Sequence, residues 1–122
     1  MTRIIWTAGA ALLVAAATAQ AQQPVKVKET EKGLAAKARI SSDSAIAIAR
    51  ARVPHGTISE AELEREKGKI IYSFDMKVPG KTGIDEVNVD AVTGAATVSH
   101  ESPADEKAEA KADARAKAKK KP

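Results

Sequence analysis

The sequence predicts an α+β fold, with one short helix packed on a three- to four-stranded antiparallel sheet. Two patterns predict it. Apolar residues recur at helical spacing in residues 41–53, and apolar and polar residues alternate at the period of a strand in residues 69–78. The flanking N-terminal linker and C-terminal tail are expected to be disordered or marginally helical. A length of 122 residues favours a single domain.

The first residues have the features of a secretory signal peptide. Arg3 gives a short positive region, residues 4–17 are almost wholly apolar, and residues 19–21 (Ala-Gln-Ala) offer a cleavage site. A transmembrane anchor would need about 20 apolar residues, and this run ends sooner. We therefore expect residues 1–21 to be a signal peptide cleaved after Ala21, and the mature protein to be periplasmic or secreted. The chain has no cysteine, which excludes disulfides.

The positive charge of the chain belongs to its tail. The formal net charge is +4, but residues 22–102 carry twelve basic and twelve acidic side chains. The basic excess of the mature chain therefore lies in residues 103–122. A basic tail without a basic folded surface, on an exported protein, gives little support to nucleic-acid binding. We expect no nucleic-acid partner.

The segment after the signal peptide is expected to be a polar linker. Residues 22–39 are mostly polar or charged, with one short apolar cluster from Leu34 to Ala36. Such a cluster is too short for a stable helix, so it predicts at most one helical turn. We place the start of the folded domain at residue 40.

A short helix is predicted next. Ser41 or Ser42 can cap its N-terminus, and Ile40 is placed to pack back on it as a hydrophobic staple. Pro54 and Gly56 follow its last apolar residue, where helices commonly end. A helix of about ten residues needs a packing partner. The residues expected to face the sheet are Ala45, Ile46, Ala49 and Val53.

The clearest strand covers residues 69–78. A bend at residues 66–69 joins it to a preceding strand, and a turn at residues 79–83 joins it to a following one. Two shorter strands, residues 84–90 and 95–100, complete the predicted sheet. The inward-facing residues of these strands are expected to be Ile70, Tyr72, Phe74, Met76, Val78, Val87, Val89, Ala96 and Val98.

The strand before the bend alternates less perfectly. Ala61 and Leu63 face inward, whereas Ile58 is out of phase with them, which predicts a β-bulge near Ser59 or Glu60.

The loop within residues 87–98 is predicted to be a structural turn. Asp90 can accept backbone N–H groups of the turn, Thr93 follows, and Gly94 supplies a positive φ. A phosphate-binding glycine loop would need several glycines and an adjacent helix N-terminus, and the sequence predicts neither.

Three blocks in order resemble the PepSY domain family. They are SSDSAIAIARARVPHG, TISEAELEREKGKIIYSFDMKV and IDEVNVDAVTGAATV, within residues 41–98. We therefore define residues 40–101 as a PepSY-like domain. The family occurs in propeptides of thermolysin-like metallopeptidases and in small secreted or membrane-attached bacterial proteins, and a role in restraining peptidases has been proposed for it. The resemblance implies a binding role and no catalytic motif. Because this sequence has no H-E-x-x-H motif and stops at residue 122, we expect restraint in trans.

Candidate chemistry in the domain is sparse. Without cysteine or a G-x-S-x-G motif, nucleophilic catalysis is not expected, and we predict that the protein is not an enzyme and uses no cofactor. His55 and His100 are expected at the surface, and no metal site is predicted, since calcium sites favour curved loops over flat strands. Glutamates alternate with other residues along the predicted strand within residues 60–66. This pattern favours either a solvated sheet face or contact with a basic partner. The candidate partner-binding face consists of Glu60, Glu62, Glu64, Ser73, Asp75 and Lys77.

The tail, residues 102–122, is rich in alanine and lysine. Ser102 is a candidate cap, Pro103 suits a first helical position, and Asp105 and Glu106 suit the first turn. Its apolar face is only alanine, so it can bury little. Two interpretations stay open, a solubilising extension and an arm that binds anionic surfaces. The candidate anionic-surface contacts are Arg115, Lys117, Lys119, Lys120 and Lys121.

The sequence therefore predicts an exported, non-enzymatic protein-binding module that restrains a peptidase in trans. The alternative is an envelope-associated accessory protein held to anionic surfaces by its tail. A small sheet with open edges also invites pairing with a partner strand or with a second copy as a homodimer.

Overall fold

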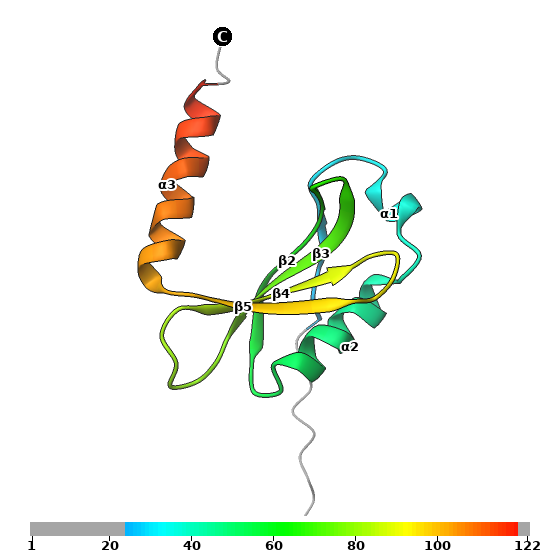
Figure 1. Cartoon of the computed structure of the whole chain (residues 1–122), viewed down its shortest axis with the longest axis horizontal. Helices are drawn as coiled ribbons and strands as arrows, with labels where there is room; N and C mark the ends of the chain where they lie inside the picture. Colours follow the sequence, from blue (N-terminus) through cyan, green and yellow to red (C-terminus); the bar gives the residue numbers. More distant parts are fainter. Residues whose placement is uncertain (1–23, 120–122) are drawn as a thin grey trace, which may run out of the picture.

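The computed structural model describes residues 24–119, so the predicted signal peptide lies outside the described residues. The fold is α+β, with helices on both sides of one sheet (Figure 1). Its elements in order are β1 (Lys28–Glu29), α1 (Leu34–Lys37), α2 (Ser42–Arg52), β2 (Thr57–Glu66), β3 (Lys69–Lys77), β4 (Ile84–Asp90), β5 (Ala96–Glu101) and α3 (Pro103–Lys119).

The sheet has five strands in the order β1-β2-β3-β4-β5. Strands β2 to β5 form an antiparallel meander, whereas β1 pairs parallel to β2. The prediction of a three- to four-stranded antiparallel sheet is therefore wrong in the number of strands and in the direction of one. The strand that was not predicted is β1, which has only two residues in a charged segment. No alternating pattern of apolar residues therefore indicates it. A parallel pair needs a long crossover, and α1 and α2 supply it here.

The segment expected to be a polar linker packs against the sheet. Thr30 donates its N–H to the Leu63 carbonyl at 3.0 Å, which extends the β1 pairing. The single turn α1 that follows brings Leu34 into the core at 1% exposure. Val25 and Val27 pack on the same core. The expected turn of helix is thus present, but the chain before it pairs with β2 and packs on the core instead of forming a free linker.

Helix α2 begins and ends where the sequence predicts. Ser41 is its N-cap, and the Ser41 Oγ accepts the Ser44 N–H at 3.1 Å. The Tyr72 hydroxyl donates to the Ile40 carbonyl at 2.7 Å and so ties the start of the helix to β3. The residues predicted to face the sheet are all buried: Ala45, Ile46 and Ala49 of α2, and Val53 directly after it.

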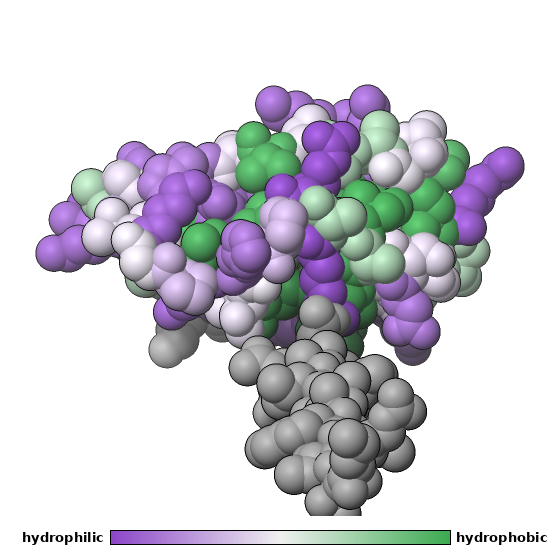
Figure 2. All heavy atoms as spheres, turned by 90° about the horizontal axis from the view of Figure 1, so that it is seen from below, coloured by the Kyte–Doolittle hydropathy of each residue, from purple (hydrophilic) through white to green (hydrophobic). Residues whose placement is uncertain are grey.

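The core lies between α2 and one face of the sheet. The predicted bulge is confirmed, because the β2–β3 register shifts between Ile58 and Glu60. Lys67 and Gly68, both with positive φ, form the tight turn between β2 and β3. Seen from below, hydrophobic residues reach the surface in small patches among hydrophilic ones (Figure 2). The sheet residues buried most completely are Phe74, Met76, Val87 and Val89.

The turn between β4 and β5 is held by Asp90. Its Oδ1 accepts the N–H groups of Val92 at 2.8 Å and Thr93 at 3.0 Å. Gly94 has a φ of 78°, and a Cβ there would lie 2.9 Å from Cδ1 of Ile40. The glycine therefore serves both the backbone conformation and the close approach of Ile40.

The tail forms helix α3, where the sequence predicted at most a marginal one. Ser102 and Asp105 cap it reciprocally, since Ser102 donates its N–H to Asp105 Oδ2 at 3.0 Å and its Oγ accepts the Asp105 N–H at 3.3 Å. None of its described residues is buried. No helix within residues 24–119 combines the length and apolar character needed to cross a membrane.

Candidate functional site

The sheet face opposite α2 gathers carboxylates from three strands. On β2 they alternate with the inward residues, and Asp75 on β3 lies opposite Glu60 in the register. Helix α3 adds Glu109 and Asp113 from the other side, which leaves a groove of about 460 Å³ between helix and sheet. The charged residues that line this acidic groove are Glu60, Glu62, Glu64, Glu66, Asp75, Glu86, Glu109 and Asp113.

Most of the predicted partner-binding face is brought together here. Glu60, Glu62 and Glu64 line the groove with Ser73 and Asp75. Lys77 lies at the end of β3, is exposed, and does not line the groove. The face is therefore more acidic than the predicted set, because Glu86 and two tail carboxylates join it. No ion pair within residues 24–119 involves a carboxylate of the groove.

Burial and mutual repulsion raise the pKa values of several carboxyl groups on this face. Burial, followed by the charges of Glu60 and Glu86, raises the pKa of Asp75 to about 6. Burial, a hydrogen bond with Glu86 and the same negative surroundings raise the pKa of Glu101 to about 7. The pKa values of Glu62 and Glu64 are also raised, mainly by burial. Cationic side chains entering the groove would relieve this repulsion and favour the ionised forms.

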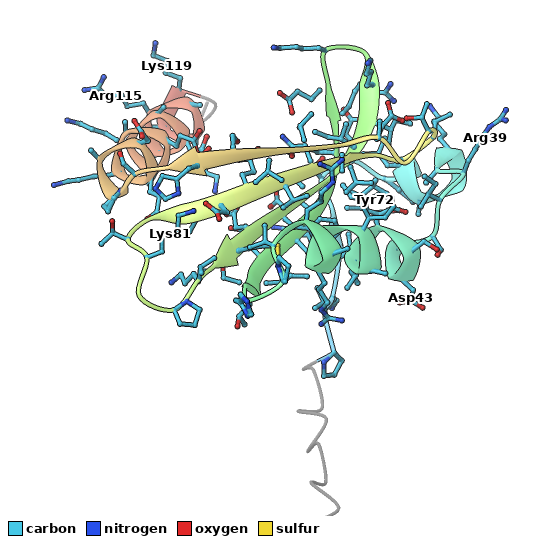
Figure 3. All side chains as sticks on the ribbon, turned by 60° about the horizontal axis from the view of Figure 1, so that its bottom comes forward. Arg39, Asp43, Tyr72, Lys81, Arg115 and Lys119 are labelled. Carbon is cyan, nitrogen blue, oxygen red and sulfur yellow. The ribbon has the colours of Figure 1, made fainter. Side chains whose placement is uncertain are left out.

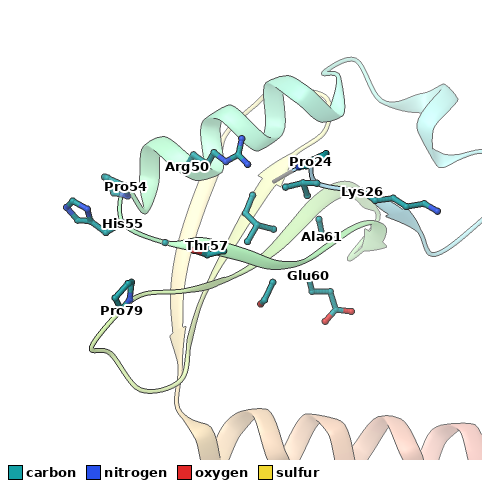
Figure 4. A pocket seen from close by; sticks show the side chains of 13 residues that line it. Pro24, Lys26, Arg50, Pro54, His55, Thr57, Glu60, Ala61 and Pro79 are labelled. Atoms are coloured by element: carbon teal, nitrogen blue, oxygen red, sulfur yellow. The ribbon is translucent and has the colours of Figure 1, made fainter. Parts of the chain in front are cut away.

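A second hollow lies along the uncovered part of β2. Strand β1 pairs only with Glu62 and Leu63, so residues 57–61 have no paired strand on that side among the described residues. A cavity of about 600 Å³ opens there, between residues 24–26 and the turn after α2 (Figure 4). Arg50, His55 and Pro79 are among its lining residues. Beyond β1, this edge of β2 is therefore bordered by a hollow and not by a strand.

Sequence reasoning missed a polar cluster on the other face of the sheet, around the buried Asp85. Asp85 is 7% exposed and accepts two hydrogen bonds from Lys81 Nζ at 3.0 Å. His100 Nδ1 lies 2.8 Å from the Asp85 Oδ1. The hydrogen bonds with His100 and Lys81 lower the pKa of Asp85. The available signal was that Asp85 alternates in phase with Val87, so a charge on the core face needed partners.

The histidines are placed differently from each other. Both are exposed, as expected, but His55 lies in the turn after α2, whereas His100 lies in β5 and its ring contacts Asp85. Within the described part of the chain, no three His, Asp or Glu side chains are arranged to hold a metal ion.

The basic tail residues lie apart from the acidic groove. Because Glu109 and Asp113 line the groove, the basic residues of α3 occupy its other sides. Arg115 and Lys119 point away from the sheet (Figure 3), and Lys117 is exposed. Lys120 and Lys121 lie outside the described residues. The surface of the described residues thus separates an acidic groove from a basic helix face.

Comparison with known proteins gives one match. A family model described as the peptidase propeptide and YPEB domain, PepSY, matches residues 39–97. This segment contains α2, β2, β3, β4 and the start of β5, and leaves out β1, α1 and α3. No curated protein and no solved structure matches the chain.

Proposed function

Because residues 39–97 of this chain belong to the PepSY family, we propose that the protein is an exported, non-enzymatic binding module that restrains a peptidase in trans. The observation that carries the proposal is the family match, whose description names peptidase propeptides. The matched residues hold α2, most of the sheet and every buried residue of the core cluster except Leu34. A compact domain of this kind acts by surface contact.

The acidic groove is the proposed contact surface. Its carboxylates from β2 and β3 form no ion pair within residues 24–119, and burial is the first cause that raises the pKa of Asp75 to about 6. A peptidase surface bearing lysine or arginine would supply the missing charge. As pH falls through about 6, Asp75 takes up a proton and the attraction weakens. Binding is therefore expected to be stronger at pH 7.5 than at pH 5.5.

A peptidase assay tests the proposal. Residues 22–122 are titrated into a thermolysin-like metallopeptidase while cleavage of a fluorogenic peptide is followed. We expect the cleavage rate to fall with added protein. The triple variant Glu60→Gln, Glu62→Gln, Glu64→Gln should need at least about tenfold more protein for half-inhibition, since several charge contacts are lost together.

The matched control is Asp43→Asn, which removes an exposed carboxylate on α2, across the sheet from the groove. It should inhibit like the unmodified chain. An unchanged cleavage rate at every concentration would contradict restraint of this peptidase class. Equal inhibition by the triple variant would remove the groove from the contact.

The tail offers a second candidate function, attachment to anionic envelope surfaces. It is favoured by the separation of the basic side of α3 from the sheet, with Arg115 and Lys119 directed outward. Each basic residue near a charged membrane contributes about 1 kcal/mol. Sedimentation with vesicles containing an anionic lipid tests it. The chain with glutamine at Arg115, Lys117, Lys119, Lys120 and Lys121 should stay in solution, and high salt should release the unmodified chain.

A further inference from the structure

Strand β5 is an open edge of the sheet. It pairs with β4 and has no second neighbour among residues 24–119. Asp90 donates its N–H to the Ala95 carbonyl at 2.8 Å, within the same register that pairs Val89 with Ala96. Since hydrogen-bonded pairs alternate along an antiparallel ladder, Thr97 and Ser99 bond to β4. Ala96, Val98 and His100 therefore direct their backbone N–H and C=O groups away from the sheet.

This edge lacks the usual protection against pairing. The opposite edge is shielded, because β1 covers part of β2 and a bulge at Ser59 distorts the rest. Strand β5, in contrast, has no proline and no lysine, and its register with β4 runs without a shift. Edge strands that stay single usually carry such features. Helix α3 leaves β5 after Ser102 and lies over the groove, so it does not cover the edge.

One exposed apolar side chain, that of Val98, lies on the open edge. The large hydrophobic residues exposed in the described chain are Val92, at 46%, and Val98, at 44%. Val98 lies opposite Val87, whose side chain is in the core under α2. Its side chain thus lies on the α2 side of the sheet, where α2 leaves it partly uncovered. A strand added at this edge would cover it.

We propose that β5 pairs with β5 of a second copy in an antiparallel, two-fold symmetric dimer with the two Val98 residues facing each other. In this register Ala96 lies opposite His100 and Thr97 opposite Ser99, so no like charges face each other. The residues with outward backbone groups pair with one another, as an antiparallel ladder requires. The two sheets join into one, both α2 helices lie on the same side, and the two Val98 side chains are buried between them.

The dimer does not depend on the proposed peptidase contact. No residue of β5 lines the acidic groove or the cavity beside β2, so the pairing leaves both accessible. A chain that fails to inhibit a peptidase can therefore still dimerise, and the two proposals fail separately.

Sedimentation of residues 22–122 over a concentration series tests the pairing. We expect a monomer–dimer equilibrium that Val98→Lys weakens at least about tenfold, because two lysines would then face each other across the axis. Val92→Lys is the matched control, since Val92 is equally exposed but lies in the preceding turn. It should dimerise like the unmodified chain. Circular dichroism of both variants verifies that the exposed substitutions leave the fold intact.

A cysteine crosslink tests the register, since the chain contains no cysteine. Cα atoms of a hydrogen-bonded pair lie about 5.5 Å apart, within the range of a disulfide. Val98→Cys should form a covalent dimer under mild oxidation, and Val92→Cys should not. A chain that stays monomeric at its highest soluble concentration overturns the proposal, as does a dimer insensitive to Val98→Lys. A monomer that instead binds an extended peptide at β5 assigns the edge to a partner and equally overturns it.

Discussion

Asp85 illustrates at the scale of one residue how a charge is kept on the core face of a strand. Its carboxylate is 7% exposed and is held by His100 at 2.8 Å and Lys81 at 3.0 Å. These hydrogen bonds lower its pKa below the usual 3.8. The folded state therefore favours the ionised form. The resulting stability is present above pH 3.8 and is lost as pH falls through the lower folded pKa.

Asp85→Asn is expected to destabilise the domain by about 1–3 kcal/mol at pH 7. A neutral buried amide would then replace the carboxylate that Lys81 and His100 contact. The difference from the unmodified chain should shrink as pH falls below 3.8, where the native carboxylate becomes protonated. Urea unfolding at several pH values measures both effects. Asp43→Asn, at an exposed site, should change stability by less than about 0.5 kcal/mol. Equal stability of Asp85→Asn and the unmodified chain at pH 7 would contradict the proposed role of the cluster.

Asp75 is expected to respond to pH in the opposite direction. Its pKa is raised to about 6, first by burial, so the folded state binds the proton more tightly than the unfolded state. Stability from this carboxyl therefore decreases as pH rises from 3.8 to about 6. Asp75→Asn should stabilise the domain at pH 7 by up to about 1 kcal/mol, a figure reduced for solvent screening of a partly exposed group. Thermal unfolding at pH 7 and pH 4 measures it, and a gain that persists at pH 4 would contradict the electrostatic cause.

Local side-chain chemistry was predictable from the sequence, and long-range pairing was not. The cap at Ser41 and the turn at Asp90 follow from hydrogen bonds to backbone groups two or three residues away. Asp85 and His100 are 15 residues apart and meet only through the register of β4 and β5. That register depends on the length of the turn between the strands, which single-residue patterns do not encode.

At the scale of elements, periodicity decided what could be predicted. Helix α2 and strand β3 each repeat their pattern over several residues, and the bulge in β2 showed as a break in phase at Ile58. Strand β1 and helix α1 have two and four residues, too few to establish a period. Helix α3 was predictable from its caps, but its place over an acidic sheet face was not, because its own groove-facing residues are acidic too.

Leu34→Ala tests whether the segment before α2 is part of the folded unit. Leu34 is 1% exposed and belongs to the central core, so its truncation should destabilise the domain by about 2–5 kcal/mol. Urea unfolding of residues 22–122 measures the change. Val92→Ala removes an aliphatic side chain that is 46% exposed and should cost under about 1 kcal/mol. Similar effects of the two variants would mean that α1 does not dock on the sheet in solution.

At the scale of the whole molecule, the two sides of the sheet are stabilised differently. Helix α2 covers one side through buried apolar residues, whereas α3 faces the other across a groove lined by carboxylates on both walls. Like charges across the groove oppose its closure, and little apolar burial of α3 offsets them, because none of its described residues is buried. The position of α3 over the sheet therefore depends on the charge of Glu109 and Asp113, the α3 residues that face the groove.

Glu109→Lys tests that arrangement in solution. The negative charge of Glu109 is one of the causes that raise the pKa values of Asp75 and Glu101. A lysine at this position should lower both pKa values, because a cation favours the ionised carboxylates across the groove. Lys107→Glu is the control: it lies two residues earlier and about 200° around the helix, so it should leave both pKa values nearly unchanged. Carboxyl chemical shifts followed by NMR over pH 3–8 report them directly. If Asp75 and Glu101 titrate in Glu109→Lys as they do in the unmodified chain, α3 extends away from the sheet in solution. The acidic face of β2, β3 and β4 would then be open to a partner without any contribution from the tail.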